Sequence, residues 1–524
     1  MVSKYYLSNH SLSDEEEDIH SRKNIDNWIF RLLLLIIGFL PLIIGAHATE
    51  VISPKLTTIN LVTSGMKGDT FTFYKMLFLI AVTTIIVILF LSKIFFMNGT
   101  IKATKMNYFL ITILLFIIVS TLFSPSKTIA LWGQFNRSDG GISYICYLVL
   151  FFVAMNLEFP KKALNYIMYS LYPLILINFI LITMNFYGKD ALQYNIVEKL
   201  MTIFLPSEAS LNEGSTLMGT LNQWNYMSGM FAIMTVMFLT WSLFDKNLVR
   251  SIINMIISVF SLSIMLMSLS TSGFLTVLQI SLIIIYIVIR SDNRKKSLVL
   301  LLSFFILSLP IFHVLAKENP RVWNESIGFI IKDNPYIHEQ ASTKTSYYKI
   351  DLTNKAFAAE NSFELPKLPA SGLAPGSGRL YIWEKTFNLI QERPLLGYGL
   401  DTLMYHFPHY NIDARAGMRT EHTIVDKPHN MYIGVLYGTG IVGLIGFMGL
   451  IVITAFSALK GLFKTRNHTI SVLSIGWLAF LIQAMFNDSL PGTSAPMWTL
   501  AGIMMAIILT QKEQLKESTD GRNN

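Results

Sequence analysis

Arginine and histidine side chains gather in one polar stretch of an otherwise apolar chain, between residues 377 and 430. Guanidinium is permanently charged, and its rigid fork of N–H donors matches the oxygens of a phosphate. Imidazole titrates near neutral pH and can therefore take a proton from a hydroxyl group. The stretch thus predicts phosphate binding combined with general-base chemistry. Its members are Arg379, Arg393, Arg415, Arg419, His406, His409, His422 and His429.

The phosphate is expected to belong to a lipid, because apolar runs flank the stretch on both sides. A lipid-linked pyrophosphate is a good leaving group without a nucleotide, and arginines can stabilise the charge that develops on it without a metal. The acceptor would be a sugar or protein hydroxyl. Walker A, HExxH and CxxC patterns are missing, and the six residues between His422 and His429 are not a usual zinc spacing. We therefore expect no metal, nucleotide or other cofactor.

The composition is that of a membrane protein. Of 524 residues, 52% are hydrophobic and 14% are charged, whereas a soluble protein carries about 25% charged residues. Most apolar runs are apolar on all sides, which excludes a pair of soluble domains with amphipathic helices. The net charge of +8 is attributed to cytoplasmic loops and not to nucleic-acid binding. The single cysteine, Cys146, can form no disulfide within the chain.

Runs of about 18 or more apolar residues predict membrane-spanning helices. We expect about twelve such spans, and hence an all-α polytopic membrane protein with a large extracytoplasmic loop. An even number of spans places both termini on one side. The predicted spans are 28–44, 73–92, 107–123, 142–157, 164–186, 223–244, 251–269, 273–290, 297–315, 431–457, 470–487 and 496–511.

Lysine and arginine in alternate short loops predict the orientation, because such residues favour the cytoplasmic side. Both termini should then be cytoplasmic, and the segment before the last spans should lie outside. The predicted organisation is a cytoplasmic tail over 1–27, about nine spans over 28–315, an extracytoplasmic catalytic loop over 316–430, about three spans over 431–511, and a cytoplasmic tail over 512–524. The basic residues are Lys93, Lys102, Lys105, Lys161, Lys162, Lys246, Arg250, Arg290, Arg294, Lys295, Lys296, Lys460, Lys464 and Arg466.

Within the outer loop, a helix is predicted over Leu380–Glu392. It should stop at Arg393, because proline disfavours helix in the residue before it and Pro394 follows. Apolar residues recur at helical spacing, which predicts a face lying on the membrane surface or on neighbouring spans. That face comprises Leu380, Trp383, Phe387 and Ile390.

Two polar segments outside this loop carry further expectations. The acidic run Asp14–Asp18 is expected to be a solvated, mobile tail. In the loop over 187–222, Val197–Leu205 is expected to form a short interfacial helix. The segment 219–225, which includes Asn222 and Asn225, predicts either an interrupted helix start at a wet cavity or an ordinary helix start capped by asparagine.

Each candidate side chain also has a structural interpretation. Arg379 can extend its guanidinium to the lipid headgroups, and His429 can cap the span that follows it. Trp383 can be an interface aromatic residue. Arg137 and Asp139 can form a weak surface ion pair. Taken singly, Arg379 and His429 fit these interpretations, so the functional hypothesis depends on their combination.

Short motifs in a fixed order resemble the O-antigen ligase and polymerase family of bacterial envelope proteins. The strongest are Ser377-Gly378-Arg379 with Trp383, Pro394-Leu395-Leu396-Gly397-Tyr398-Gly399, and Pro428-His429-Asn430 followed by Gly434, Leu436, Gly438, Gly440 and Gly443. Weaker ones are Trp132-Gly133 with Arg137 and Gly140-Gly141, Gly219-Thr220 with Asn222 and Asn225, and Gln483, Phe486-Asn487 and Trp498. The resemblance covers most of the chain from about 124 to 502.

The resemblance implies a GT-C-like membrane glycosyltransferase in the bacterial plasma membrane. Such an enzyme transfers a glycan from undecaprenyl pyrophosphate to a glycan, lipid or protein acceptor, with inversion at the anomeric carbon. By position, Arg379 matches the arginine that holds the pyrophosphate, and His429 matches the histidine that activates the acceptor. The family often has a further arginine in a middle span, where this chain has Leu269-Ser270-Thr271-Ser272-Gly273-Phe274. Arg137, Arg321 or Arg415 is then expected to supply the second phosphate contact.

The full set of residues predicted to contact substrate is Arg137, Trp383, Asn222, Asn225, Asn430, Arg321 and Arg415. A surface-polysaccharide polymerase or ligase is our first interpretation, and protein O-glycosylation is a variant of it. A flippase for the same lipid is the alternative, and a non-catalytic assembly protein is a third. Ion-coupled transporters usually carry ionisable residues inside their spans or paired repeats. The cores of the spans at 251–315 contain none, which favours the enzyme.

Overall fold

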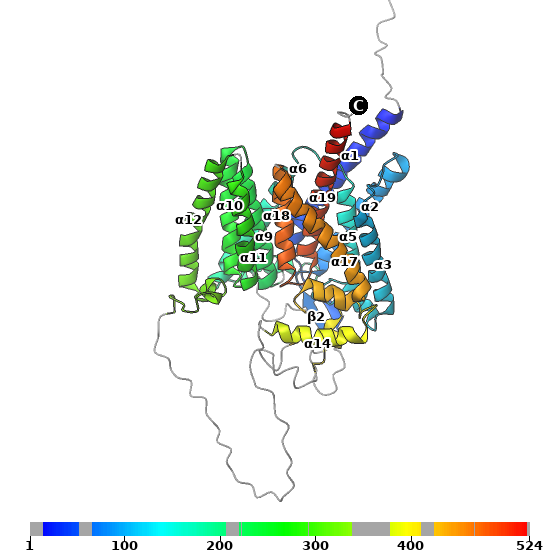
Figure 1. Cartoon of the computed structure of the whole chain (residues 1–524). Helices are drawn as coiled ribbons and strands as arrows, with labels where there is room; N and C mark the ends of the chain where they lie inside the picture. Colours follow the sequence, from blue (N-terminus) through cyan, green and yellow to red (C-terminus); the bar gives the residue numbers. More distant parts are fainter. Residues whose placement is uncertain are drawn as a thin grey trace, which may run out of the picture.

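A computed structural model describes residues 14–51, 65–205, 219–221, 223–291, 293–337, 378–409, 424–465 and 467–520. Helices dominate this part of the chain (Figure 1). The elements are α1 (Asp14–Leu34), η1 (Leu35–Phe39), η2 (Leu40–Leu42), β1 (His47–Val51), β2 (Gly65–Asp69), α2 (Phe73–Phe96), α3 (Lys105–Phe123), α4 (Lys127–Trp132), α5 (Gly141–Met155), α6 (Ala163–Ser170), α7 (Tyr172–Phe186), η3 (Ala191–Gln193), α8 (Asn195–Met201), α9 (Trp224–Phe244), α10 (Leu248–Met267), α11 (Thr271–Ile289), α12 (Arg294–Glu318), α13 (Arg321–Asn324), η4 (Ile327–Phe329), α14 (Arg379–Glu392), α15 (Leu403–His406), α17 (Met431–Lys464), α18 (His468–Gln483) and α19 (Pro491–Asp520).

The apolar runs of the sequence are helices, which confirms the all-α polytopic class. Ten helices are long and apolar enough to cross a membrane, and the shorter apolar helices Gly141–Met155 and His468–Gln483 match two further predicted spans. The described β-structure is one antiparallel pair, in which His47 of β1 lies opposite Asp69 of β2. The predicted interfacial helix over Val197–Leu205 is observed as the shorter α8.

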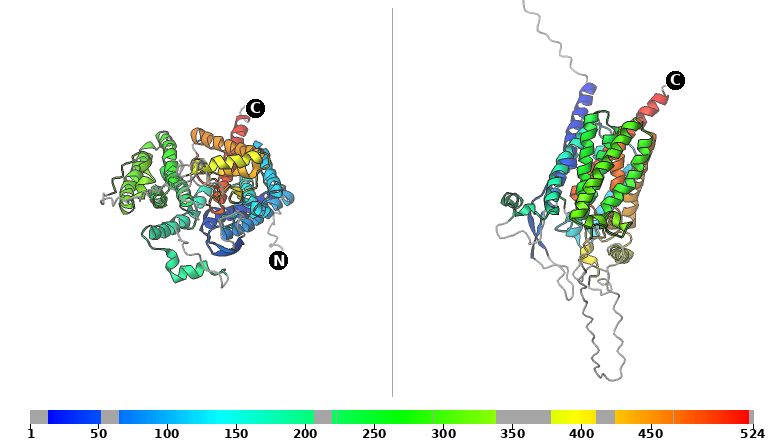
Figure 2. Two further views of the ribbon diagram at one scale, coloured as in Figure 1. Left: turned by 90° about the horizontal axis from the view of Figure 1, so that it is seen from below. Right: turned by 90° about the vertical axis from the view of Figure 1, so that its left-hand side faces the viewer.

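The bundle has two distinct ends. The beginning of α1 and the end of α19 lie at one end, and α14 lies across the other, roughly perpendicular to the spans (Figures 1 and 2). The basic loops, which were predicted to be cytoplasmic, join helices at the end that carries the chain termini. The even number of predicted spans is consistent with this arrangement.

The prediction of an unstructured acidic tail is wrong from Asp14 onward. Residues Asp14–Asp18 form the first turn of α1, and the helical run continues through η1 and η2 to Leu42. Carboxylates at the start of a helix are favoured by its dipole, which accounts for helix formation in a charged sequence. The side chains of Glu15, Glu16 and Glu17 are exposed, and that of Asp18 is half-buried.

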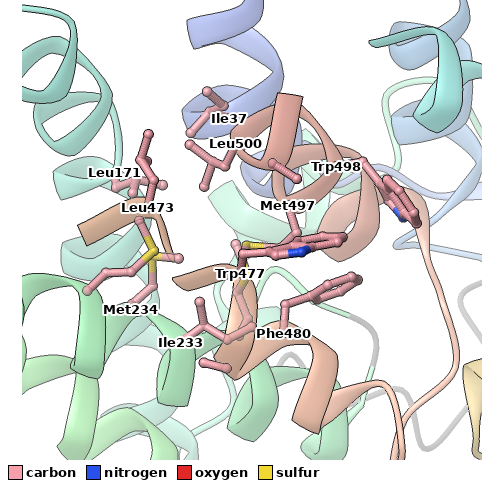
Figure 3. Packing of buried hydrophobic residues seen from close by; sticks show 14 of the residues in the cluster. Ile37, Leu171, Ile233, Met234, Leu473, Trp477, Phe480, Met497, Trp498 and Leu500 are labelled. Carbon is pink, nitrogen blue, oxygen red and sulfur yellow. The ribbon is translucent and has the colours of Figure 1, made fainter. Parts of the chain in front are cut away.

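The hydrophobic core lies around α9, α18 and α19. The window of α9 that would cross the membrane is 94% buried, so protein surrounds this helix on nearly all sides. Trp477 of α18 packs edge-on against Trp498 of α19 with ring centroids 5.2 Å apart (Figure 3). The Trp477 indole N–H donates to Thr454 Oγ1 at 3.1 Å, so the buried polar atom has a partner.

Helix α17 bends at Gly440, and the bend is stabilised by the loop after α14. Gly440 has φ +70°, which leaves neighbouring backbone groups outside the helical hydrogen-bond ladder. The loop replaces these bonds: Tyr398 N donates to Tyr437 O and Gly399 N to Gly438 O, both at 2.9 Å, and Ile441 N donates to Pro394 O at 2.8 Å. Irregular backbone at membrane depth requires such partners. The bend separates a short first limb, which lies beside α14, from the long spanning limb (Figure 1).

Helix α14 confirms the predicted helix and extends it by one residue, to Arg379. Its buried residues are Ile382, Thr386 and Ile390. Of the predicted apolar face, Leu380 and Phe387 remain exposed. The buried residues of α14 are therefore spaced i, i+4 and i+8 along one face. Ile382 and Ile390 on this face belong to a small satellite core together with Tyr398 and Tyr437.

Candidate functional site

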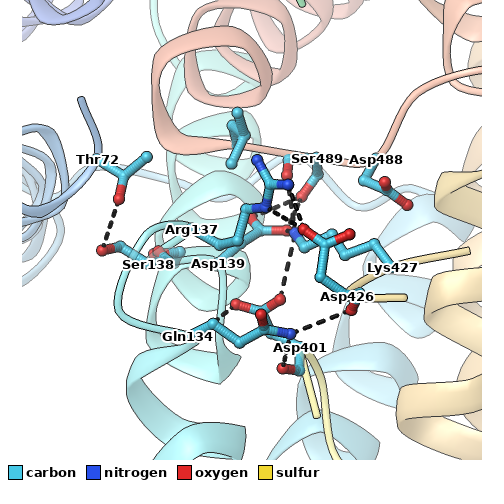
Figure 4. A network of polar contacts seen from close by, with 12 residues as sticks. Thr72, Gln134, Arg137, Ser138, Asp139, Asp401, Asp426, Lys427, Asp488 and Ser489 are labelled. Atoms are coloured by element: carbon cyan, nitrogen blue, oxygen red, sulfur yellow. Dashed lines mark hydrogen bonds and ion pairs between the residues drawn. The ribbon is translucent and has the colours of Figure 1, made fainter. Parts of the chain in front are cut away.

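Charged side chains from four separate segments converge at the α14 end of the bundle (Figure 4). The segments are the loop between α4 and α5, the loop before α15, the chain before α17, and the turn between α18 and α19. A charge withdrawn from water is costly unless it is paired and hydrogen-bonded. The cluster consists of Gln134, Arg137, Asp139, Asp401, Asp426, Lys427, Asp488 and Ser489.

Arg137 is buried and pairs with Asp426. Its side chain is 2% exposed, its Nε lies 3.0 Å from Asp426 Oδ2, and its Nη2 contacts the same oxygen. Burial by itself would raise the pKa of Asp426, but Arg137 and then His429 hold that pKa at about 2. The suggested surface pair of Arg137 with Asp139 is wrong, because each is buried with a different partner.

Lys427 is shared by two buried carboxylates. Its Nζ lies 3.0 Å from Asp139 Oδ2 and 3.4 Å from Asp401 Oδ1. Asp139 also accepts hydrogen bonds from Ser489 Oγ and from Tyr147 Oη, the latter at 3.0 Å. Burial raises the pKa of Asp401 to about 6 although Lys427 opposes this, and burial also raises the pKa of Asp139. One ammonium between two acids therefore leaves a carboxyl that binds a proton readily.

Backbone conformation sets the position of this cluster. Gly133 has φ +91°, and a Cβ at that position would meet the backbone of Asp139 and the carboxylate of Asp401. Asp401 has φ +61° and is held by Gln134 N, which donates to Oδ2 at 2.7 Å. A small cavity of about 30 Å³ is lined by Asp139, Asp401, Asp426, Lys427, Asp488 and others. This volume is about that of one water molecule.

His429 and Asp488 form an imidazole–carboxylate pair at the edge of the cluster. His429 Nδ1 lies 3.1 Å from Asp488 Oδ2; the histidine is 27% exposed and the aspartate 5% exposed. Asp488 Oδ1 accepts from Asn430 N at 3.2 Å, which fixes the carboxylate. The contact is an ion pair and not a hydrogen bond, because Asp488 Oδ2 has no hydrogen-bond partner among the described residues. A carboxylate near one ring nitrogen favours a proton on that nitrogen.

The start of α17 is capped by Asn430 and not by His429. Asn430 Oδ1 accepts from Tyr432 N at 3.0 Å and from Ile433 N at 3.1 Å. The Asn430 side chain also donates to Met485 O at 3.1 Å. His429, immediately before the cap, has φ +52°, an uncommon backbone conformation for a residue other than glycine. The cap thus holds the histidine in a fixed direction, while the amide of Asn430 is already occupied.

Arg379, the first residue of α14, faces the same aspartate. Burial lowers the pKa of Arg379, whereas Asp488 and Tyr226 favour its charged form. Tyr226 and Asp488 also favour the charged form of Arg137. The Arg137 guanidinium lies 6.0 Å from the centroid of the Tyr226 ring. Both arginines thus lie around one tyrosine and one aspartate. Trp383 links α14 to the site loop, because its indole N–H donates to Pro428 O at 2.7 Å.

Two buried donors of this group lack a hydrogen-bond partner among the described residues. They are Arg137 Nη1 and Tyr226 Oη. An unpaired buried donor costs free energy comparable to a lost hydrogen bond. Three acceptor oxygens of the cluster, Gln134 Oε1, Asp401 Oδ1 and Asp488 Oδ2, also lack a hydrogen-bond partner among the described residues. The cluster therefore has free donors and free acceptors for a polar ligand.

Of the other predicted contacts, Asn225 adjoins this group, Arg321 lies apart from it, and two lie outside the described residues. Asn225 Oδ1 accepts from Ser270 Oγ at 3.0 Å, and its carbonyl accepts from Asn487, so it joins α9 to neighbouring helices. Arg321 begins α13 and is exposed, with no contact to the cluster among the described residues. Asn222 and Arg415 lie outside the described residues. At the position without the expected arginine, Thr271 Oγ1 donates to Glu325 at 2.7 Å.

The sequence interpretation missed most of the acidic partners. Asp401, Asp426, Lys427 and Asp488 were not selected, and neither was Tyr226. A usable signal was present: in a chain with 14% charged residues, aspartates stand at several span ends that topology places on one side. Asp426 and Lys427 directly precede the Pro428-His429 motif, so proximity in sequence also marked them.

Comparison with known families gives one match. Residues 256–448 match the family model described as O-Antigen ligase. The matched range begins within α10, ends within α17, and contains Arg379 and His429. Arg137, Tyr226 and Asp488 lie outside it. The search of curated proteins gave no match.

Proposed function

We propose that this chain, whose residues 256–448 match the O-antigen ligase family model, is an inverting membrane glycosyltransferase of that family. It moves a glycan from an undecaprenyl-pyrophosphate donor to an acceptor hydroxyl, without metal or nucleotide. The acceptor is a growing surface polysaccharide or a lipid-linked glycan, and a protein hydroxyl is the variant. The observation that carries this proposal is the His429–Asp488 pair together with the buried Arg137 and the half-buried Arg379, both of which interact electrostatically with Asp488.

In the proposed reaction, His429 is the general base. Asp488 holds Nδ1, so Nε2 takes the proton of the acceptor hydroxyl as its oxygen attacks the anomeric carbon. The new C–O bond forms while the bond from that carbon to the phosphate oxygen breaks, and the electron pair leaves with undecaprenyl pyrophosphate. Attack opposite the leaving group inverts the anomeric carbon. The imidazolium then releases its proton to water, and the net products are the extended glycan and the lipid pyrophosphate.

The proposed phosphate contacts are Arg379 and Arg137. Charge grows on the pyrophosphate as the sugar leaves, and fixed guanidinium groups in a site with little water stabilise that charge strongly. Arg137 Nη1 and Tyr226 Oη are buried donors without described partners, and both lie near Asp488 as Arg379 does. We therefore choose Arg137, and not Arg321, as the substitute for the arginine that this chain lacks near Thr271.

The proposed membrane orientation places the α14 end outside the plasma membrane and both termini in the cytoplasm. The basic loops at the opposite end support it. Single cysteines at residues 384 and 246, in a Cys146→Ala background, test it with a thiol reagent that does not cross membranes. Labelling at residue 384 and not at 246 is expected in intact cells, and the reverse pattern contradicts the proposed orientation.

The decisive experiment uses the purified full chain in proteoliposomes, with an undecaprenyl-pyrophosphate glycan and candidate acceptors. No nucleotide is added, and EDTA is present. Release of undecaprenyl pyrophosphate in step with glycan extension or transfer is expected. Movement of the intact donor across the bilayer without bond cleavage would instead identify a flippase. Transfer that Arg379→Ala and His429→Ala both leave unchanged would refute the assigned site.

A further inference from the structure

A second and larger cavity lies at the end of the bundle that carries the chain termini. Its volume is about 650 Å³, and its walls come from the loop between α9 and α10, the end of α11 with the start of α12, and the end of α17 with the start of α18. The motifs that carry the family resemblance contribute no residue to its lining, and the proposed transfer reaction does not use it. We name it the basic cavity, after its lining residues Lys246, Arg290, Arg294, Lys296 and Lys464.

Positive charge in the basic cavity exceeds negative charge. The described lining residues include these five lysines and arginines and one carboxylate, Asp245. That carboxylate is already paired with Arg250, which lies outside the lining, and its pKa is lowered by this hydrogen bond although burial opposes the change. Lys296 is bound internally, since it donates to Asp245 O and to Ser251 Oγ. Within the described residues, Arg290, Arg294 and Lys464 have no carboxylate partner.

The cavity also has an apolar wall, which continues into exposed apolar side chains of α11. Tyr286 of α11 packs edge-on against Phe463 of α17 with ring centroids 5.1 Å apart. Both rings remain more than 40% exposed, and Leu282 and Ile289 on the same helix are more exposed still. The guanidinium of Arg290 lies over the Tyr286 ring at 5.3 Å, which places the cationic rim directly beside this apolar surface.

This combination of charge and apolar surface matches one chemical class. A phosphate needs guanidinium and ammonium donors, whereas an acyl chain needs an apolar surface continuous with the bilayer. We propose that the basic cavity binds the headgroup of an anionic phospholipid, with its acyl chains lying along Tyr286 and Phe463. Arg290, Arg294 and Lys464 contact the phosphate. Bound lipid then joins α11, α12 and α17, which have few direct connections at this end.

The test measures lipid binding by the purified full chain in detergent. The probes are short-chain phosphatidylglycerol, phosphatidylcholine of the same chain length, and inorganic phosphate. The variant carries Arg290→Gln, Arg294→Gln and Lys464→Gln. The matched control carries Lys105→Gln, Lys161→Gln and Lys162→Gln, three exposed lysines that were predicted to lie on the same side. The readouts are the Kd and the shift of the thermal unfolding midpoint.

Phosphatidylglycerol should raise the unfolding midpoint of the wild type and of the control, and phosphatidylcholine should not. The Kd of the cavity variant should rise about tenfold or more, because each basic group near an anionic lipid adds to binding. An equal loss in the control would mean general attraction of basic loops to anionic lipid and would overturn the proposal. The same midpoint shift with inorganic phosphate would identify a free anion as the ligand and overturn the lipid assignment.

A second measurement does not depend on the variants. Phosphatidylglycerol with a photoreactive group on its acyl chain should crosslink the wild-type protein at peptides containing residues 282–289 or 456–463. Crosslinks distributed over the whole lipid-facing surface would contradict a single site. Because transfer activity enters neither readout, failure of this proposal is distinguishable from failure of the proposed glycosyltransferase.

Discussion

The two ends of the bundle carry cations in opposite states. At the α14 end, Arg137 and Lys427 are buried, and each is matched to aspartate. At the other end, Arg290, Arg294 and Lys464 are exposed and lack a carboxylate partner among the described residues. A buried charge requires a partner, whereas an exposed charge is already stabilised by water and headgroups.

The difference indicates what each end can do. The buried cluster holds its members at fixed distances, as a reaction needs, because developing charge is stabilised best by groups that do not have to reorganise. The exposed rim is adaptable, which suits binding of a lipid headgroup but not orientation of a reacting bond. The same residue types thus favour catalysis at one end and membrane attachment at the other.

The largest expected effect is on transfer. Asp488→Asn removes the carboxylate that orients His429, so the rate should fall about 10²–10⁴-fold, the range of general-base catalysis. His429→Ala should have a similar effect, and the double variant should be little worse than either single one, since the two residues act as one unit. Single-turnover transfer with reconstituted enzyme measures this. Asp333→Asn, an exposed aspartate after α13, is the control; additive losses in the double variant would contradict the pairing.

The next expected effect is on the free energy of unfolding, which should respond differently to loss of an arginine at each end of the bundle. Arg137→Gln removes a buried cation and leaves Asp426, whose side chain is 20% exposed, without it, so the free energy of unfolding should fall by about 3 kcal/mol, the low end for a broken buried pair. Arg290→Gln removes an exposed cation and should change stability little. Unfolding in mixed micelles at neutral pH measures both variants. Equal losses would mean that burial does not distinguish the ends.

Disturbing the bend of α17 should weaken the function of the α14 end and leave lipid binding at the opposite end unchanged. Gly440→Ala places a side chain at φ +70° and ψ −174°, a region that glycine alone adopts readily, and against the Leu395 carbonyl. The backbone strain alone should cost about 1–3 kcal/mol. Transfer should weaken, while phosphatidylglycerol binding at the basic cavity should persist. Gly434→Ala is the matched control, because its nearest neighbour would be Pro428 Cγ at 3.7 Å. Loss of lipid binding in Gly440→Ala would show that the two limbs are not independent.

A further expected effect is a pH dependence of stability. Folded Asp401 keeps its proton up to a pKa of about 6, whereas the unfolded chain releases it near 3.8. The folded state binds more protons between these values, so its stability falls as pH rises from about 4 to about 6, by at most about 1.4 kcal/mol per pKa unit. Asp401→Asn should flatten this slope. Unfolding midpoints at pH 4, 5, 6 and 7 measure it, and an unchanged slope would assign the proton elsewhere.

Much of the architecture could be predicted from local sequence. Apolar runs alone located the spans, because a helix must bury or expose to lipid every side chain along its length. Pro394 ended α14 as expected, since the restriction on Arg393 is local. The acidic start of α1 was predicted wrongly, because composition suggested disorder while the helix dipole favours carboxylates at that terminus.

The partners in the cluster could not be predicted, because pairing depends on distance in space. Asp426 lies 289 residues from Arg137 in the sequence, and Asp139 lies 288 residues from Lys427. The choice among Arg137, Arg321 and Arg415 likewise needed coordinates, which leave Arg321 exposed and Arg137 buried beside Tyr226.

The sequence by itself determined that this chain is a helical membrane protein and that Arg379 and His429 were its foremost functional candidates. Hydrophobic length and residue chemistry are properties of single segments, and they do not require knowledge of neighbours. Only the tertiary structure decided that His429 meets Asp488, that Arg137 joins Asp426, and that an unmatched cationic rim closes the opposite end. Electrostatic free energy varies with separation and burial, and both are set when distant segments pack together.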